Sequence, residues 1–298
     1  MSGPPTRTMR RPSLLIVGCG DVGLRVVRLL RGRYRLLALT TNAARCTELR
    51  QMGAIPLLGN LDDPATLARL AGLAEAVLHL APPEPVGVSD GRTARLLGAL
   101  ARHGRPQRLV YASTSGVYGD AGGARFDETR AVQPATDRAR RRVDAERRVR
   151  WFGAAFGCAA TVLRIPGIYA ADRPGGHPRE RLERGTPALV PADDVYTNHI
   201  HADDLARACV AALQRGLPQR VVQVCDDTEL KMGDYFDLAA DLCGLPRPPR
   251  ITRDVARERL SPMLFSFMSE SRRLDNGRMK RELRLKLRYP TAREGLVA

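Results

Sequence analysis

Lysine is almost absent from this chain of 298 residues. Only Lys231, Lys280 and Lys286 occur among 48 basic residues, so arginine supplies nearly all of the positive charge and the formal net charge is +16. A chain this basic raises nucleic acid or an anionic membrane as partners. The arginines are dispersed along the sequence among Ala, Gly and Pro, and the densest run, residues 138–150, also carries acidic residues. We therefore expect neither a nucleic-acid partner nor a membrane partner.

Cysteine pairs and long apolar runs are also missing. The six cysteines are widely separated and form no CxxC pair, which is typical of reduced thiols in a cytoplasmic protein. No stretch approaches the roughly 18–20 apolar residues that span a bilayer. The apolar run after Arg10 and Arg11 is shorter than the roughly 7–15 residues at the centre of a signal peptide, so a first β-strand explains it better.

Composition places the chain among globular proteins. Hydrophobic residues make up 44% and charged residues 27%, which is too apolar for a disordered chain. The length suits one large α/β domain, or one such domain with a small lobe.

Apolar runs and helical periodicity alternate through the first three quarters of the sequence. Near-continuous apolar strands separated by helices predict a parallel sheet covered on both faces, the doubly wound Rossmann-type α/β fold. The predicted strands are residues 13–17, 35–39, 54–58, 76–80, 108–112, 160–164 and 221–224. The predicted helices follow residue 22 and span residues 43–52, 64–70, 93–103, 143–156 and 204–214.

Composition shifts suggest the domain boundaries. Residues 1–12 are rich in Pro, Arg and Gly and are expected to form a disordered lead-in. Residues 13–225 carry the alternating pattern and form the expected nucleotide-binding domain. Within them residues 171–198 hold several Pro and Gly residues and predict a loop-rich excursion. Residues 226–298 are expected to be a mostly helical small lobe that contacts the substrate.

A glycine-rich turn follows the first predicted strand. Its pattern is GxGxxG, and in a strand-to-helix turn this pattern favours the binding of a dinucleotide. Glycine permits the tight turn, lets the backbone approach a diphosphate and brings the helix close to the strand. The helix N-terminus then offers free N–H groups to the phosphates. The predicted contacts are Gly18, Gly20, Asp21, Val22 and Gly23.

The end of the second strand bears on the choice between NAD and NADP. A carboxylate there would accept a hydrogen bond from the adenosine 2′-hydroxyl and select NAD. This chain has Thr40, Thr41 and Asn42 instead, followed by Arg45. Hydroxyl groups and a guanidinium can hold a 2′-phosphate, so the sequence favours NADP over NAD. A turn accounts for Thr41 and Asn42 equally well.

The fifth predicted strand and the turn after it read VYASTSGVYGD, residues 110–120. This segment resembles the extended short-chain dehydrogenase/reductase superfamily, in particular its NAD-dependent epimerase/dehydratase group. Residues 59–62, 77–81, 163–169 and 199–206 add to the resemblance, which covers most of residues 13–225. It implies an oxidoreductase, epimerase or dehydratase activity and further cofactor contacts near the adenine, the nicotinamide ribose and the nicotinamide. These are Asn60, Leu61, Leu80, Ala81, Pro82, Ile165 and Ile168.

The resemblance also implies catalytic residues, and here the sequence departs from the family. By register Thr114 occupies the position of the catalytic Ser/Thr. The family pairs a Tyr with a Lys four residues later, and the Lys lowers the phenol pKa so that it exchanges a proton near neutrality. Counting back from Glu146, those two positions hold Arg138 and Arg142.

A guanidinium stays protonated, so Arg138 cannot act as an acid or a base, whereas Arg142 can still bond the ribose and supply charge. Tyr118, Tyr169 or water would have to supply the proton, and Thr114, Arg142 and Tyr118 are the predicted catalytic residues.

One metal-like pattern also needs an interpretation. His199, His201 and Asp203 alternate and could be drawn as a metal site. A half-buried strand with Asp203 capping the next helix explains the alternation without a metal, so no metal is expected.

Two hypotheses from different classes remain. The first is an atypical oxidoreductase or epimerase that uses NADP or NAD on a small substrate, with a sugar-like molecule as one candidate. The second is a catalytically silent cofactor-binding sensor or regulator, which the missing Tyr and Lys would explain. The expected assembly is a monomer or a homodimer.

Overall fold

The computed structural model describes residues 10–297. Most of the lead-in predicted for residues 1–12 lies outside the described residues. From residue 10 onward the chain enters the fold directly, because the carbonyl group of Pro12 accepts a hydrogen bond of 2.9 Å from the backbone N–H of Arg35.

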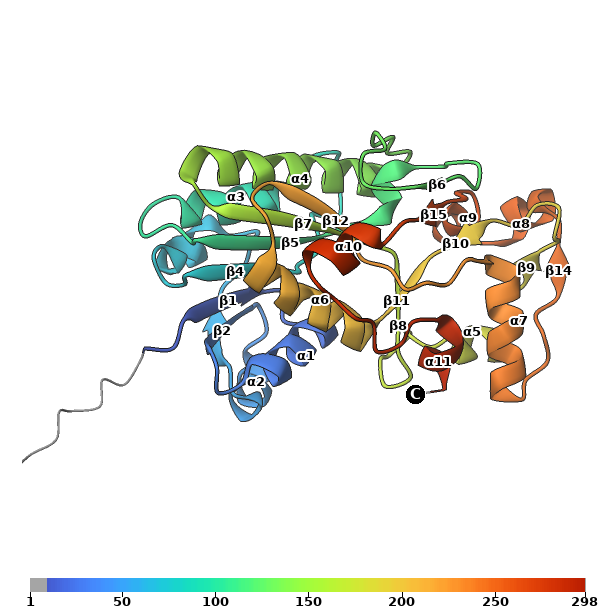
Figure 1. Cartoon of the computed structure of the whole chain (residues 1–298), viewed down its shortest axis with the longest axis horizontal. Coiled ribbons are helices and arrows are strands. Elements are labelled where there is room, and N and C mark those ends of the chain that lie inside the picture. The colour runs from blue at the N-terminus through green and yellow to red at the C-terminus, as the bar shows by residue number, and fades with distance from the viewer. Residues whose placement is uncertain (1–9, 298) are drawn as a thin grey trace, which may run out of the picture.

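Seven parallel strands form the central sheet (Figure 1). Their order across the sheet is β12-β7-β5-β4-β1-β2-β3, so the chain starts near the middle and winds outward in both directions. The predicted doubly wound Rossmann-type fold is confirmed. The strands are β1 (Ser13–Val17), β2 (Arg35–Thr40), β3 (Ile55–Leu58), β4 (Ala76–His79), β5 (Arg108–Thr114), β7 (Ala159–Ile165) and β12 (Arg220–Gln223).

Alternating side chains divide the core into two layers. On β1, Leu14 and Ile16 join the apolar cluster on one face of the sheet, while Leu15 and Val17 join the cluster on the other face. Successive side chains of a strand point to opposite faces, so an unbroken apolar strand requires cover on both.

Helices provide that cover on each face. The first face is covered by α1 (Asp21–Leu30), α2 (Cys46–Met52) and α6 (Ala202–Arg215). The second is covered by the 3-10 helix η2 (Pro64–Leu70), α3 (Gly91–Leu100) and α4 (Asp137–Phe156). Figure 1 shows α3 and α4 on one side of the sheet and α1 and α6 on the other.

The longest of these helices begins earlier than expected. Its apolar periodicity predicts a start at Val143, but α4 begins at Asp137. The Thr136 hydroxyl caps it by accepting a 3.2 Å hydrogen bond from the backbone N–H of Ala139. The first turns carry arginines instead of an apolar stripe, so periodicity alone missed them.

A smaller lobe stands beyond the carboxyl ends of β5, β7 and β12 (Figure 1). Its apolar cluster combines Tyr169, Leu182 and Leu189 with later residues such as Phe236 and Leu296. Short paired strands connect it: β6 (Arg125–Phe126), β8 (Gly167–Tyr169), β9 (Ala188–Leu189), β10 (Tyr196–Thr197), β11 (His199–His201), β13 (Leu230–Lys231), β14 (Arg250–Ile251) and β15 (Arg273–Leu274). Its helices are α5 (Arg179–Glu183), α7 (Met232–Cys243), α8 (Arg253–Arg259), α9 (Pro262–Phe267) and α11 (Ala292–Leu296).

The chain also returns from the lobe to the sheet. Helix α10 (Gly277–Glu282) contacts β12, and its Met279 is fully buried in the cluster on the first face. Across residues 10–297, no helix combines the length and the apolar character needed to cross a membrane.

Candidate functional site

The three glycines of the turn after β1 have three different surroundings. Gly18 has φ +86°, and a Cβ there would lie 2.5 Å from the backbone nitrogen of Ala81. At Gly23 a Cβ would lie 3.1 Å from Sγ of Cys19, so this glycine lets α1 pack closely on the turn. A Cβ on Gly20 would meet no atom within 4 Å. Only Gly20 therefore borders open space.

That open space lies at the start of α1. Gly20 is the N-cap residue and offers no side chain to the helix, whose first backbone hydrogen bond runs from Leu24 N–H to the Gly20 carbonyl oxygen. The backbone N–H groups of Asp21, Val22 and Gly23 precede that bond and have no partner within the helix. The turn therefore combines a cradle that a Cβ would fill with donors suited to a diphosphate.

An ionic cluster anchors the same helix. The guanidinium of Arg25 is buried and pairs with Asp21, Asp172 and Asp203. Burial opposes its charge, but the three carboxylates outweigh that effect and raise the Arg25 pKa. The Asp21 side chain is committed to this cluster, so any contact with a cofactor falls to its backbone N–H.

Where the sequence predicts the adenosine, a guanidinium lies against the glycine turn. Arg45 donates a 2.8 Å hydrogen bond from Nη1 to the Cys19 carbonyl oxygen and pairs with Glu48 at 3.1 Å. Asn42 caps the 3-10 helix η1 (Ala43–Arg45) by accepting from Ala44 N–H, so it serves the turn. The Thr40 hydroxyl accepts from Asn42 N–H at 3.2 Å, while Thr41 is exposed.

The predicted adenine turn after β3 is tied to α3. Asn60 accepts a 2.9 Å hydrogen bond from Asp62 N–H, and the Leu61 carbonyl oxygen accepts one from Arg95. The Asp62 carboxylate pairs with Arg92 at 2.6 Å, and this contact holds its pKa below the usual range.

The strand ends predicted to lie near the nicotinamide meet at the same edge of the sheet. The backbone N–H groups of Leu80 and Ala81 both donate to the Val17 carbonyl oxygen, at 2.8 and 3.0 Å, which joins the end of β4 to the glycine turn. Pro82 is exposed just beyond them. Ile165 pairs with Thr114 in the sheet register, and Ile168 lies half-buried on β8.

Arg142 contacts β5, the strand that ends at Thr114. The Thr114 hydroxyl is half-buried and accepts a 3.2 Å hydrogen bond from Gly116 N–H. Arg142 reaches over from α4 and donates from Nη1 to the Ala112 carbonyl oxygen at 2.7 Å and to the Tyr111 hydroxyl at 3.0 Å. The guanidinium that occupies the Lys register therefore contacts the strand that carries Thr114.

The two phenols predicted as proton sources, Tyr118 and Tyr169, are both buried. Tyr118 is fully buried, and its hydroxyl accepts a 2.8 Å hydrogen bond from Nε2 of Gln223. The Tyr169 hydroxyl is buried against Asp226 at 3.3 Å. Burial raises the pKa of both phenols. The two hydroxyls are therefore engaged with Gln223 and Asp226, and neither bonds Thr114 or Arg142 within residues 10–297.

A buried ion pair behind Thr114 was not identified from the sequence. The Glu146 carboxylate accepts from Arg164 at 2.7 Å and from the Ser113 hydroxyl at 2.5 Å, and both charged groups are buried. The guanidinium of Arg164 also lies 4.7 Å from the Tyr118 ring centroid. A signal was available, because an arginine within the apolar strand 159–165 needs a carboxylate partner.

A buried histidine on β4 was also passed over. His79 shares a 2.9 Å hydrogen bond between Nε2 and the Thr93 hydroxyl, and its ring lies 5.2 Å from that of Tyr111. Burial lowers the His79 pKa to about 3 and raises the Tyr111 pKa to about 12, so both rings stay neutral near pH 7.

The metal-like pattern has another explanation, and the capping prediction is wrong. The His201 side chain is the N-cap of α6, because its Nδ1 accepts from Asp203 N–H at 3.2 Å, while Asp203 lies in the first turn and pairs with Arg25. His199 stacks on Tyr235 with the ring centroids 3.9 Å apart. Among residues 10–297 no group of three His, Cys, Asp or Glu side chains is placed to hold a metal ion.

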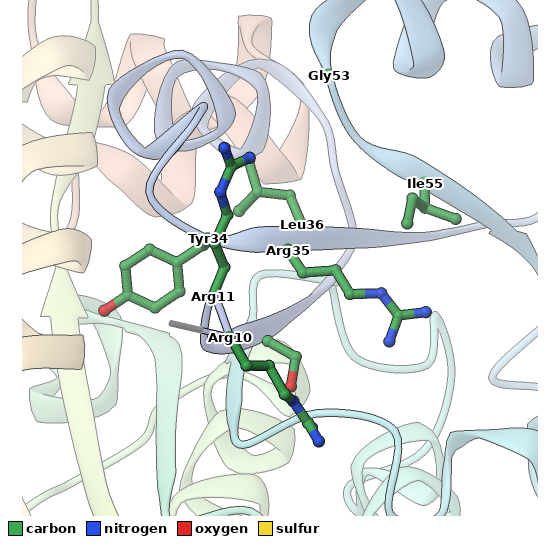
Figure 2. Close-up of a pocket in the computed structure, with 8 residues that line it drawn as sticks. Arg10, Arg11, Tyr34, Arg35, Leu36, Gly53 and Ile55 are labelled. Carbon is green, nitrogen blue, oxygen red and sulfur yellow. The ribbon is translucent and has the colours of Figure 1, made fainter. Parts of the chain in front are cut away.

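A hollow of about 580 Å³ lies at the opposite end of the sheet, beside the start of β1 and β2. Figure 2 shows Arg10, Arg11 and Arg35 around it, with Tyr34 and Ile55. None of the predicted cofactor-binding or catalytic residues lines this hollow, so it is separate from the candidate site.

The seven-stranded order, the glycine turn at the start of α1 and the strand ends that meet there define a Rossmann-fold nucleotide-binding protein. The family model described as "NAD dependent epimerase/dehydratase family" matches residues 14–225, and the chain belongs to that family. No curated protein matches the chain.

Solved structures resemble the chain along nearly its whole length. A functionally unknown conserved protein from Silicibacter pomeroyi DSS is 33% identical, with 96% of each chain covered and a TM-score of 0.80. UDP-glucose 4-epimerase from Thermotoga maritima, solved with UDP-glucose, is 20% identical with the same coverage and a TM-score of 0.78. UDP-glucuronic acid 4-epimerase from Bacillus cereus, solved with NAD, is 16% identical with the same coverage and a TM-score of 0.75. The two epimerases share the fold with this chain.

Proposed function

We propose that this chain is an oxidoreductase or epimerase/dehydratase that holds NAD(P) at the glycine turn and acts on a small substrate beside Thr114. The open space at Gly20, next to the unpartnered N–H groups of α1, carries the proposal. A bound nicotinamide would supply the hydride donor or acceptor. A nucleotide sugar is one substrate class, because the Thermotoga maritima epimerase was solved with UDP-glucose.

The chain's own groups suggest how a substrate would be handled. The Thr114 hydroxyl would hydrogen-bond a substrate oxygen, and the fixed charge of Arg142 would stabilise negative charge that develops nearby. Arg142 does not supply the proton, because a guanidinium does not titrate in the physiological range. With Tyr111 and Tyr118 buried, we assign proton exchange to water.

NADP is the proposed preference. The end of β2 carries no carboxylate, and Arg45 lies against the glycine turn, where it would face a 2′-phosphate. Replacing Arg45 with Gln should weaken NADPH binding at least about tenfold, the loss of one charge-assisted hydrogen bond, and leave NADH binding within about twofold. Equal effects on both cofactors in fluorescence titrations would refute the assignment.

The direct test of cofactor binding is a fluorescence titration with NADH and NADPH. Gly20→Val should abolish binding of both while the unfolding midpoint stays close to that of the wild type, because the new side chain enters space that only a ligand fills. Gly98→Val is the matched control, since Gly98 is also open to solvent but lies on α3 away from the site. Undiminished binding by Gly20→Val would refute the site.

The second candidate function is a cofactor-binding sensor without turnover. The observation in its favour is that arginines occupy the Tyr and Lys positions and that Tyr111, Tyr118 and Tyr169 are all buried. Bound NADPH that no hydroxy, oxo or nucleotide-sugar compound oxidises would favour this alternative, whereas turnover with any of them would exclude it.

A further inference from the structure

Two arginines near the start of α4 have no carboxylate partner. Arg138 and Arg142 are four residues apart, so they lie on the same side of the helix. Among the ion pairs of residues 10–297, neither guanidinium lies within 4.0 Å of an acidic side chain. Arg142 donates only to the neutral groups of Tyr111 and Ala112. The guanidinium of Arg138 lies over the face of the Phe267 ring, with Cζ 4.9 Å from the ring centroid.

The other arginines in this part of α4 are accounted for. Arg140 pairs with Asp137 at 2.7 Å, and Arg148 pairs with Asp144 at 2.8 Å. Arg141 is buried and donates a 2.5 Å hydrogen bond to the carbonyl oxygen of Gly87. Arg147 and Arg150 form no ion pair within residues 10–297 either, but they are exposed, and Arg138 is exposed as well. A solvated charged face therefore leaves the half-buried Arg142 unexplained.

Like charges four residues apart on a helix destabilise it. The Arg138 pKa is lowered, first by desolvation of its guanidinium and then by the charge of Arg142. The one carboxylate that acts against this effect, Glu270, is itself paired with Arg272 at 2.5 Å. A negative group between the two guanidiniums would relieve the repulsion.

The location connects this charge to the proposed reaction. Arg142 bonds the carbonyl group of Ala112, two residues before Thr114, and Arg138 lies one helical turn earlier on α4, beside Phe267 at the end of α9. Loop residue Gly87, which follows β4, flanks the same part of α4 through Arg141. Arg142 thus contacts the strand whose end carries Thr114, where a substrate oxygen would bond.

We propose that Arg138 and Arg142 form a subsite for a carboxylate or phosphate group at the reacting end of the substrate, beside the oxygen held by Thr114. The substrate is then an anionic hydroxy or oxo compound. Paired guanidiniums suit both anions, because their planar N–H donors match carboxylate and phosphate oxygens. This inference rests on the proposed function.

The test is calorimetric titration of the full chain saturated with NADPH, so that the glycine turn is already filled. The probes are inorganic phosphate, lactate and the neutral analogue lactamide. Phosphate or lactate should bind with one site per chain and lactamide should not, and whichever anion binds better identifies the source of the negative charge. Binding of neither anion, or of lactamide as tightly as lactate, would overturn the subsite.

Variants separate a built subsite from general positive charge. Arg138→Gln and Arg142→Gln should each weaken anion binding at least tenfold, and Arg142→Lys should recover part of the loss. Arg147→Gln is the matched control, because Arg147 lies exposed on the same helix and its substitution removes the same charge. A loss in Arg147→Gln equal to that in Arg138→Gln would overturn the proposal.

Arg138→Gln is not expected to disturb the fold, because the Arg138 guanidinium forms no hydrogen bond within residues 10–297. If NADPH binds and the anions do not, the subsite fails while the proposed function stands. If NADPH does not bind, the proposed function itself fails.

Discussion

At the scale of single residues, the position of a charge decides what it contributes. The Glu146–Arg164 pair is buried in the core beneath the site, with side chains about 6 and 7% exposed. A buried pair adds little net stability compared with apolar residues, because both ions lose water, but removing one partner leaves the other charge uncompensated.

We therefore expect Glu146→Gln to lower the free energy of unfolding by about 3–5 kcal/mol. The matched control is Glu183→Gln, which breaks a pair with Arg179 whose side chains are both half-exposed. That change should cost less than about 1 kcal/mol. Urea unfolding of both variants without cofactor measures the difference, and equal losses would show that burial of the pair is unimportant.

At the scale of elements, the start of α4 carries Arg138 and Arg142, the charges of the proposed anion subsite. Thr136 ends the preceding loop, and its hydroxyl replaces one of the hydrogen bonds that the first helical turn lacks. Arg138 lies in that first turn, so its position depends on the cap.

Thr136→Ala should lower the free energy of unfolding by about 1 kcal/mol, while Thr136→Ser should keep most of it. Because the first turn then frays, phosphate or lactate binding to the NADPH-loaded protein should also weaken, with NADPH binding unchanged. Helicity, urea midpoints and calorimetry measure these effects. If Thr136→Ala is less stable but binds the anions as tightly as the wild type, the cap does not position Arg138 for anion binding.

The elements differ in how well they could be predicted from the sequence. The sheet strands were predictable because their apolar runs are short and bounded by turns, and the glycine turn was predictable because its spacing has a mechanical reason. The start of α4 was not, because its first turns are basic and present no apolar stripe. Tyr118 was predicted as a catalytic residue because the missing Tyr and Lys leave the proton without a source, and the structure buries its hydroxyl against Gln223 because β12, far along the chain, packs beside β7.

At the scale of the whole molecule, pH acts on the stability of the fold through groups that join its parts. His79 and His199 are buried, and burial lowers the pKa of each to about 3. In the unfolded chain their pKa is about 6.5. The stability that the fold gains by burying them as neutral rings is therefore fully present above that pH and is lost as the pH falls toward 3. Asp226 acts in the opposite direction, because burial raises its pKa to about 7.

Asp226 connects the end of the sheet to the lobe. Its carboxylate accepts from Thr228 N–H at 3.0 Å and from the Tyr169 hydroxyl at 3.3 Å, while its backbone N–H donates to the His199 carbonyl oxygen at 2.8 Å. The unfolded pKa of an aspartate is about 3.9. Between pH 4 and 7 the folded protein therefore holds a proton that the unfolded chain has released, and stability falls as the pH rises through this window.

Asp226→Asn removes this opposing effect and keeps the local hydrogen bonds. The amide oxygen can still accept from Thr228 N–H, the amide nitrogen can donate to the Tyr169 oxygen, and the Tyr169 proton can turn to the Thr291 carbonyl oxygen at 3.4 Å. The free energy of unfolding of Asp226→Asn minus that of the wild type should be about 1–3 kcal/mol higher at pH 8 than at pH 5, because only the wild type loses stability over this range. Asp254→Asn is the control, because the side chain of Asp254 is 83% exposed, and its difference from the wild type should be the same at both pH values. A pH-independent difference for Asp226→Asn would mean that Asp226 is ionised in the folded protein throughout this range, and that burial between sheet and lobe does not hold its proton.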